Sequence, residues 1–283
     1  MAKQTAKVVL VLDDSISADV AGAVVWTEHA GMCSREALAL ALTAEGVAQL
    51  APDLVTPEQA FEHARGACRA KHVLVRRCSD RETFVLVREG APAPDELEYD
   101  SALKVKLSPL GFLVFNNSTD PLVQTLRDEF DAALELADTH AIGSWLCKVL
   151  GRLGAIPMRP TGGFYFVDRT ALGTWHAIVR AVNAAATQYG FGEICAVRTD
   201  AATVRSICAS IERDVGEELE RIEDHVADGK ALDTQRDRAF ALRERIKRYE
   251  TVLGASLATL AARAEHAEST AVQAALIASM QEV

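Results

Sequence analysis

The chain has 283 residues, 49% hydrophobic and 25% charged, with a net charge of −10 at pH 7. This composition is typical of a globular protein with a hydrophobic core, and the length predicts one large domain or two modest ones. The acidic balance argues against binding nucleic acid over the whole surface, although one local basic face stays possible. No run approaches the roughly 18 apolar residues of a membrane span, so we expect an intracellular protein.

The six cysteines and seven histidines are scattered along the chain, and none of the cysteines forms a CxxC pair. A zinc site needs Cys and His clustered at short spacing, which this sequence does not provide. We therefore expect reduced, mostly buried thiols, no metal site and no cofactor. The cysteines are Cys33, Cys68, Cys78, Cys147, Cys195 and Cys208.

The first part of the chain predicts one strand and three helices. The Val-rich run 7–12 has the pattern of a buried strand and is followed by Asp13 and Asp14. Capping residues and glycines mark where helices begin and end. The helices are expected over roughly 17–30, from Ser34 to about Gly46, and from Thr56 onward with Pro57 at the first helical position.

Strands then dominate as far as residue 118. Two β-rich runs flank the polar turn 79–81, which predicts a hairpin, and a loop is expected over 90–96. Leu103, Val105 and Leu107 alternate with polar residues, which indicates a half-exposed strand, and a Pro-Leu-Gly turn leads into the next strand. The strands follow each other directly, so we predict an α+β fold with a mixed or antiparallel sheet, and a first domain over 1–118.

A second domain is expected over 119–199. Helices are predicted from Asp120 onward and over 139–153, and a strand–helix–strand unit over 164–198. The two strands of this unit would run parallel if they belonged to one sheet, because such crossovers are right-handed.

The third range, 200–283, has no strand signal. Apolar residues recur every three or four positions on two charged segments that are separated by a break at Gly229. This pattern predicts a long antiparallel helical hairpin, or coiled coil, followed by a frayed tail. Its apolar seam either packs on its own domain or joins subunits and partners. The seam residues expected for assembly are Leu219, Ile222, Val226, Leu242, Ile246, Tyr249 and Leu253.

The segment IPMRPTGGFYFVDR (156–169) admits several interpretations. A phosphate loop does not fit, because its glycines should follow a strand and precede a helix. A winged-helix element over 139–167 would bring Lys148, Arg152 and Arg159 near phosphates or base edges. The interpretation that we favour is a hairpin, in which the prolines and glycines set the register of the next strand. The loop residues are Pro160, Gly162 and Gly163.

No set of residues assembles into a catalytic site. Asp13 and Asp14 follow the first strand, where α/β proteins often place catalytic carboxylates, but the strand–helix alternation of a doubly wound sheet does not follow. A helix cap or a turn is the favoured role for these two residues. A hydrolase or nuclease that uses them is kept as an alternative.

The segments RPTGGFYFV and YETVLG, with the helices around them, resemble an uncharacterised family of phage and bacterial proteins across about 139–267. Members of that family combine an RPTGG-aromatic turn with a C-terminal coiled coil and have no established activity. The resemblance implies a phage or mobile-element setting and therefore the cytoplasm of a bacterial host cell.

Together, these features predict a non-enzymatic binding or assembly protein. We expect it to form a homo-oligomer or to bind a partner protein through its C-terminal helical hairpin. DNA binding through 139–167 is the alternative, and no membrane association is expected.

Overall fold

The computed structural model describes residues 19–29, 31–69, 73–80, 82–93, 96–161, 163–186 and 188–281. The predicted strand 7–12 and the pair Asp13 and Asp14 lie outside these residues, as does Gly162 of the predicted loop. Within them, antiparallel sheets and helices confirm the α+β fold class.

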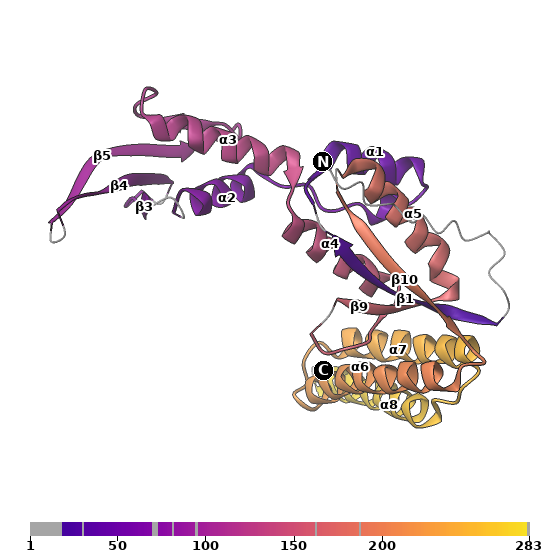
Figure 1. Cartoon of the computed structure of the whole chain (residues 1–283). Coiled ribbons are helices and arrows are strands. Elements are labelled where there is room, and N and C mark those ends of the chain that lie inside the picture. The colour runs from indigo at the N-terminus through magenta and orange to yellow at the C-terminus, as the bar shows by residue number, and fades with distance from the viewer. Residues whose placement is uncertain are drawn as a thin grey trace, which may run out of the picture. The chain divides into compact units, whose positions relative to one another are not determined.

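The elements follow one another along the chain as shown in Figure 1. The strands are β1 Val20–His29, β2 Cys33–Ser34, β3 Val73–Arg77, β4 Thr83–Ala93, β5 Glu96–Leu107, β6 Leu113–Phe115, β7 Leu136–Ala137, β8 Ile156–Pro157, β9 Phe164–Asp168 and β10 Gly190–Val197. The helices are α1 Arg35–Ala44, the 3-10 helix η1 Ala48–Leu50, α2 Pro57–Arg69, α3 Pro121–Glu135, α4 Thr139–Arg152, α5 Arg169–Ala185, α6 Ala201–Ala227, α7 Leu232–Leu253 and α8 Ala258–Gln281.

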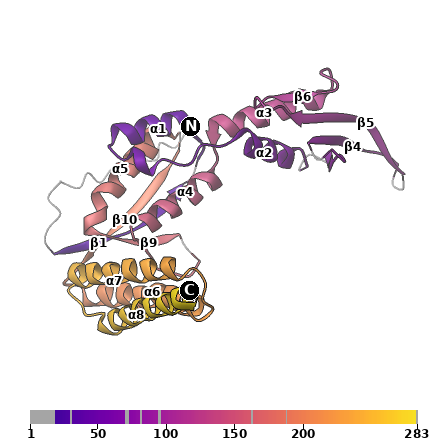
Figure 2. The same cartoon turned by 180° about the vertical axis from the view of Figure 1, so that it is seen from behind.

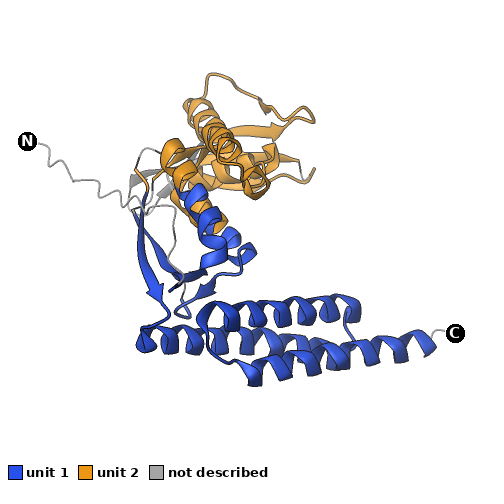
Figure 3. Cartoon of the chain, turned by 90° about the vertical axis from the view of Figure 1, so that its right-hand side faces the viewer, with its two compact units in different colours: residues 1–29, 146–179, 190–283 blue, residues 30–145, 180–189 orange. Residues whose placement is uncertain are grey.

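The contacts divide the chain into two compact units, each assembled from separate segments (Figure 3). Strand pairing explains this arrangement for unit 1, because β1 pairs with β9 and β10, which come far later in the chain. That the ranges 1–118, 119–199 and 200–283 form three separate domains stays a prediction. Unit 1 contains residues 1–29, 146–179 and 190–283, and unit 2 contains 30–145 and 180–189.

The sheet of unit 1 has the strand order β10-β1-β9-β8, and all neighbouring strands are antiparallel. Because β1 lies between β9 and β10, those two strands run in the same direction. The predicted strand–helix–strand unit is therefore present, with one strand inserted between its two strands. One face of this sheet meets α5, where the rings of Trp175 and Phe191 pack edge to face, and the other meets the helices α6–α8.

The helices α6, α7 and α8 lie side by side against the sheet of unit 1 (Figure 1). Their apolar side chains form one core with Phe166, Ile156 and Ala196 of the strands. Burial of these side chains supplies most of the stability that holds helices of this length together, since helix propensity alone is marginal in water.

Unit 2 contains the sheet β3-β4-β5-β6, again antiparallel throughout. The helices α2 and α3 cover one face of this sheet. Phe61 and Leu126 of the helices pack with Phe84, Leu86 and Leu103 of the strands. The predicted half-exposed strand is confirmed, because Leu103 and Val105 are buried between exposed residues.

The helix starts in unit 2 are where the sequence places them. The Ser34 hydroxyl accepts a hydrogen bond from the Ala37 amide at the start of α1. At the start of α2, the Thr56 hydroxyl accepts a hydrogen bond from the Gln59 amide, and the side-chain oxygen of Gln59 accepts one from the Thr56 amide. This reciprocal pair is a capping box. These side chains satisfy amide groups that the first helical turn leaves without partners.

Several local expectations are wrong. Within the segment 17–30 predicted as a helix, residues 20–29 form the strand β1, which is an inner strand of its sheet. Part of the predicted loop 90–96 belongs to β4 and β5. The second seam helix ends at Gly254, whose φ of +66° closes α7, and the expected frayed tail is the 24-residue helix α8.

Tyr249 of α7 provides a test of this core by pH. The side chain is fully buried, and its hydroxyl donates a hydrogen bond to the carbonyl oxygen of Gly154. Burial raises the pKa of Tyr249 from 10.0 to about 12. The unfolded chain therefore loses this proton first as the pH rises, so the stabilisation is present below pH 10 and is lost between pH 10.0 and about 12.

Tyr249→Phe is expected to flatten the alkaline part of the stability curve. The free energy of unfolding, measured by urea denaturation from neutral pH to pH 12, should fall less steeply for this variant than for the parent protein above pH 10. Equal slopes in that window would contradict the assignment, since lysine titration is common to both proteins.

Candidate functional site

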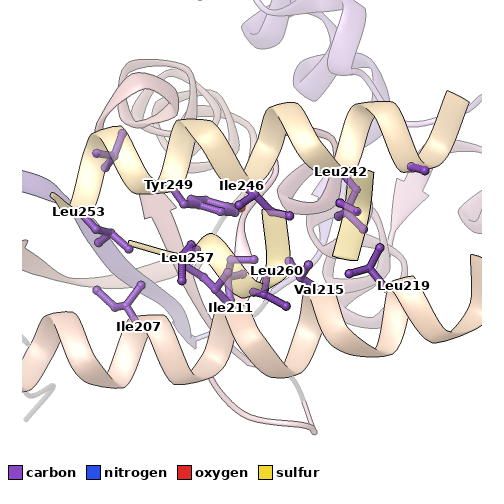
Figure 4. Close-up of a cluster of buried hydrophobic side chains, with 14 of the residues drawn as sticks. Ile207, Ile211, Val215, Leu219, Leu242, Ile246, Tyr249, Leu253, Leu257 and Leu260 are labelled. Atoms are coloured by element: carbon purple, nitrogen blue, oxygen red, sulfur yellow. The ribbon is translucent and has the colours of Figure 1, made fainter. Parts of the chain in front are cut away.

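The predicted assembly seam lies inside unit 1. Its seven residues are each at most 8% exposed, and they pack against one another and against Leu257 and Leu260 (Figure 4). Of the two alternatives for this seam, packing within its own domain is the one observed. A partner therefore has no access to these side chains while the helices stay packed. The residues are Leu219, Ile222 and Val226 on α6, and Leu242, Ile246, Tyr249 and Leu253 on α7.

Two ion pairs orient the third helix. Arg263 of α8 donates hydrogen bonds of 2.8 and 2.6 Å to the two carboxylate oxygens of Glu223 on α6. Arg243 of α7 lies 2.8 Å from the carboxylate of Glu268 on α8. These pairs are partly exposed, so each adds little stability. Because one pair links α8 to α6 and the other links it to α7, together they restrict how α8 can rotate about its axis.

In this orientation of α8, small residues near its C-terminal end face the core of unit 1 and large apolar residues face solvent. Ala264, Ala267 and Ala271 are buried in the core of unit 1. On other sides of the helix, four large apolar side chains are 37–79% exposed. We call these residues the α8 apolar face: Val272, Leu276, Ile277 and Met280.

The α8 apolar face is unusual for the surface of an acidic chain. Val272, Leu276 and Met280 recur every four residues, so they form one ridge along the helix. The segment 269–281 around them contains no charged residue. Single exposed apolar residues are ordinary, but a contiguous group of this kind is typical of an interaction site.

The turn after α4 is a β-hairpin, as the favoured interpretation predicts. Ile156 pairs with Phe166, and Pro157 with Tyr165, across β8 and β9. Gly163 has a φ of +88°, which favours glycine. The guanidinium of Arg159 lies 4.7 Å from the centre of the Phe164 ring.

The three basic residues of the winged-helix alternative are all exposed. Lys148 and Arg152 are four residues apart on α4, and Arg159 lies in the hairpin turn with Pro160. The order of helix, short strand, turn and strand is that of a winged helix. A hairpin with a purely structural role has the same order. Their role in binding nucleic acid stays a prediction.

Arginine side chains of α6 and α7 attach the hairpin to these helices. Arg213 of α6 donates a 2.7 Å hydrogen bond to the carbonyl oxygen of Pro157. Arg248 of α7 lies 3.0 Å from the carboxylate of Asp168, which ends β9, and also donates to the carbonyl oxygen of Leu153. The hairpin is therefore fixed to the helices α6 and α7 of unit 1.

The titratable groups show little sign of nucleophile activation. The expectation of mostly buried thiols is wrong, because Cys147 and Cys195 are exposed. Partial desolvation still raises the pKa of the Cys33, Cys195 and Cys208 thiols, which keeps them protonated at neutral pH. Burial also raises the pKa of Tyr165 to about 12, and its hydroxyl donates to the sulfur of Cys147. In the part of the chain that the structure describes, no three His, Cys, Asp or Glu residues are placed to hold a metal ion.

Sequence reasoning missed the α8 apolar face because the last segment was expected to fray. The available signal was the uncharged, apolar run from Ser269 to Gln281. No described helix is both long and apolar enough to cross a membrane.

The fold and these surfaces define an α+β protein with a three-helix C-terminal bundle. Residues 22–280 match the model of a family of unknown function, DUF6744, and the chain belongs to this family. This agrees with the expected membership of an uncharacterised family. Searches of curated proteins and of solved structures returned no match to the chain.

Proposed function

We propose that this chain is a non-enzymatic assembly protein that pairs with a second copy of itself through the α8 apolar face. The supporting observation is the set of large apolar side chains that α8 exposes while its alanines face the core. The C-terminal helices expected for assembly keep that role, but the contact moves from the buried seam to the outer side of α8.

A second copy is the occupant that the chemistry of this face favours. Two chains of net charge −10 repel each other over most of their surfaces. The uncharged segment 269–281 is a place where this repulsion is weakest and where apolar burial can exceed it. A partner selected by complementary charge would find nothing there to pair with.

The ridge geometry is also self-complementary. Residues spaced by four form a ridge that packs into the matching groove of an identical helix at a crossing angle of about −50°. A two-fold axis near Leu276 would place Val272 of each copy near Met280 of the other. We place this assembly in the cytoplasm of a bacterial host, in the phage or mobile-element setting that the family resemblance implies.

The double variant Leu276→Glu/Met280→Glu is expected to separate the copies. Each fully buried side chain of this size contributes about 1.5–3 kcal/mol, so losing two weakens association by more than about a hundredfold. Light scattering after size exclusion, at several protein concentrations, should give a dimer for the parent protein and a monomer for the variant.

Leu40→Glu/Leu54→Glu provides the matched control, because it makes the same chemical change at two exposed leucines of unit 2. This control should remain dimeric, and circular dichroism should show all three proteins folded. A parent protein that stays monomeric at the highest concentration, or a variant with unchanged mass, would refute the proposal.

A further inference from the structure

The sheet of unit 2 has one covered face and one open face. The helices α2 and α3 pack on the side chains of Phe84, Leu86 and Val105. Residues on alternate positions point away from this core, because side chains alternate between the two faces of a strand. Among the residues that the structure describes, three of these positions bear a positive charge.

Three cations occupy neighbouring positions on the open face. Arg76 pairs with Val85 across β3 and β4, and Val85 pairs with Lys104 across β4 and β5. Lys106 follows two residues after Lys104, which places it about 7 Å further along the same face. All three side chains are exposed, and Arg76 and Lys104 lie on strands separated by about 10 Å.

These cations have no ion-pair partner among the described residues. Lys106 acts at longer range on Asp80, whose pKa is lowered mainly by its hydrogen bonds to Thr83 and only slightly by Lys106. Asp80 already accepts hydrogen bonds from Thr83 and from the Glu82 amide. The positive charge of this face is therefore available to an external anion.

An aromatic ring lies beside the cations. Ser108 and Phe112 continue the pairing of β5 with β6, so Phe112 and Val114 share the open face with Lys106. Phe112 is 67% exposed, although a phenyl ring gains nothing from contact with water. Figure 2 shows β4, β5 and β6 as adjacent strands of this sheet.

We propose that the open face of the β3-β4-β5-β6 sheet binds single-stranded nucleic acid. Phosphates would lie at Arg76, Lys104 and Lys106, and a base would stack on Phe112. A flat sheet face does not enter the major groove, which admits a helix or a two-stranded ribbon, so a single strand fits better than a duplex. This site is separate from the residues of the winged-helix alternative and does not depend on self-association.

Fluorescence anisotropy with a labelled oligothymidine, measured at several salt concentrations, tests this proposal on the full chain. The parent protein should bind, and its affinity should fall as salt rises. Lys104→Glu/Lys106→Glu should bind at least about tenfold more weakly, and the slope of log affinity against log salt should shrink by about 1.4, since each single-strand phosphate contact adds about 0.7.

Phe112→Ala separates stacking from charge. It should weaken binding by about tenfold and leave the salt slope unchanged, because a stacked ring releases no counterion. Arg205→Glu/Arg238→Glu is the control, since it makes the same change in net charge at two exposed arginines of α6 and α7. This control should bind like the parent protein.

Each contrary result has a definite meaning. No binding by the parent protein at low salt, or equal weakening by the control pair, would overturn the site. Equal affinity for a duplex would overturn the single-strand assignment, and equal affinity for oligoglutamate would overturn recognition of nucleic acid. If Lys104→Glu/Lys106→Glu fails to fold, Lys104→Gln/Lys106→Gln takes its place with a smaller expected loss.

Discussion

Replacing Arg248 with Met is expected to lower the free energy of unfolding by about 3–5 kcal/mol, because it leaves a buried carboxylate without its counter-charge. That carboxylate belongs to Asp168, whose side chain is 1% exposed at the end of β9. The hydrogen bonds of this carboxylate come from the amide and hydroxyl of Thr170. Urea denaturation of the parent protein and the variant measures the difference.

The partner variant Asp168→Asn should be milder, at about 1–2 kcal/mol, because Arg248 is 37% exposed and can be hydrated. In the double variant, the loss should be smaller than the sum of the single losses, since the two groups interact. Lys247→Met is the neighbouring control. It removes only an exposed pair with Glu244 and should change stability by less than about 0.5 kcal/mol.

Gly22→Ala is expected to destabilise the protein by about 3 kcal/mol, because the inner strand β1 has no room for a methyl group at this position. A Cβ atom there would lie 2.2 Å from the carbonyl oxygen of Val167 and 2.8 Å from the ring of Phe166. The nearest atom is backbone of the paired strand β9, so the strands themselves must move apart.

Gly216→Ala makes the same change where space is open. Gly216 lies within α6, and a Cβ atom there would have no neighbour within 4 Å. Alanine favours a helix over glycine by about 0.5–1 kcal/mol, so this variant should be slightly more stable than the parent protein. Thermal unfolding of the two variants should therefore move in opposite directions, and a loss of stability in both would contradict the packing described for β1.

The sequence predicted elements well wherever local chemistry selects one conformation. Ser34 and Thr56 cap their helices as expected, because a hydroxyl next to free amides acts within three residues. The turn that ends at Gly111 was also expected, and its φ of +81° explains the glycine. Such signals depend on neighbours in the chain, so they can be recognised without knowledge of the fold.

The strand β1 was mistaken for a helix because its sequence has no clear period. Ala23, Val25 and Val24 are buried or half-buried on both faces of the sheet, so the run shows neither alternation nor a helical stripe. Its conformation depends on pairing with β9 and β10, which lie more than a hundred residues away. No local window of the sequence contains that information.

The α+β class, most helix starts and the apolar seam of the C-terminal helices could be predicted from the sequence, because periodicity and capping act over a few residues. Which of these surfaces are buried and which are exposed became known from the folded chain. Folding buried the seam residues, Tyr249 among them, and left Leu276 and Met280 exposed. It also placed Arg76 and Lys104 on the same sheet face, one on each side of Val85. The physical reason is that burial depends on contacts between distant segments, so the same apolar or charged pattern can form a core or a surface.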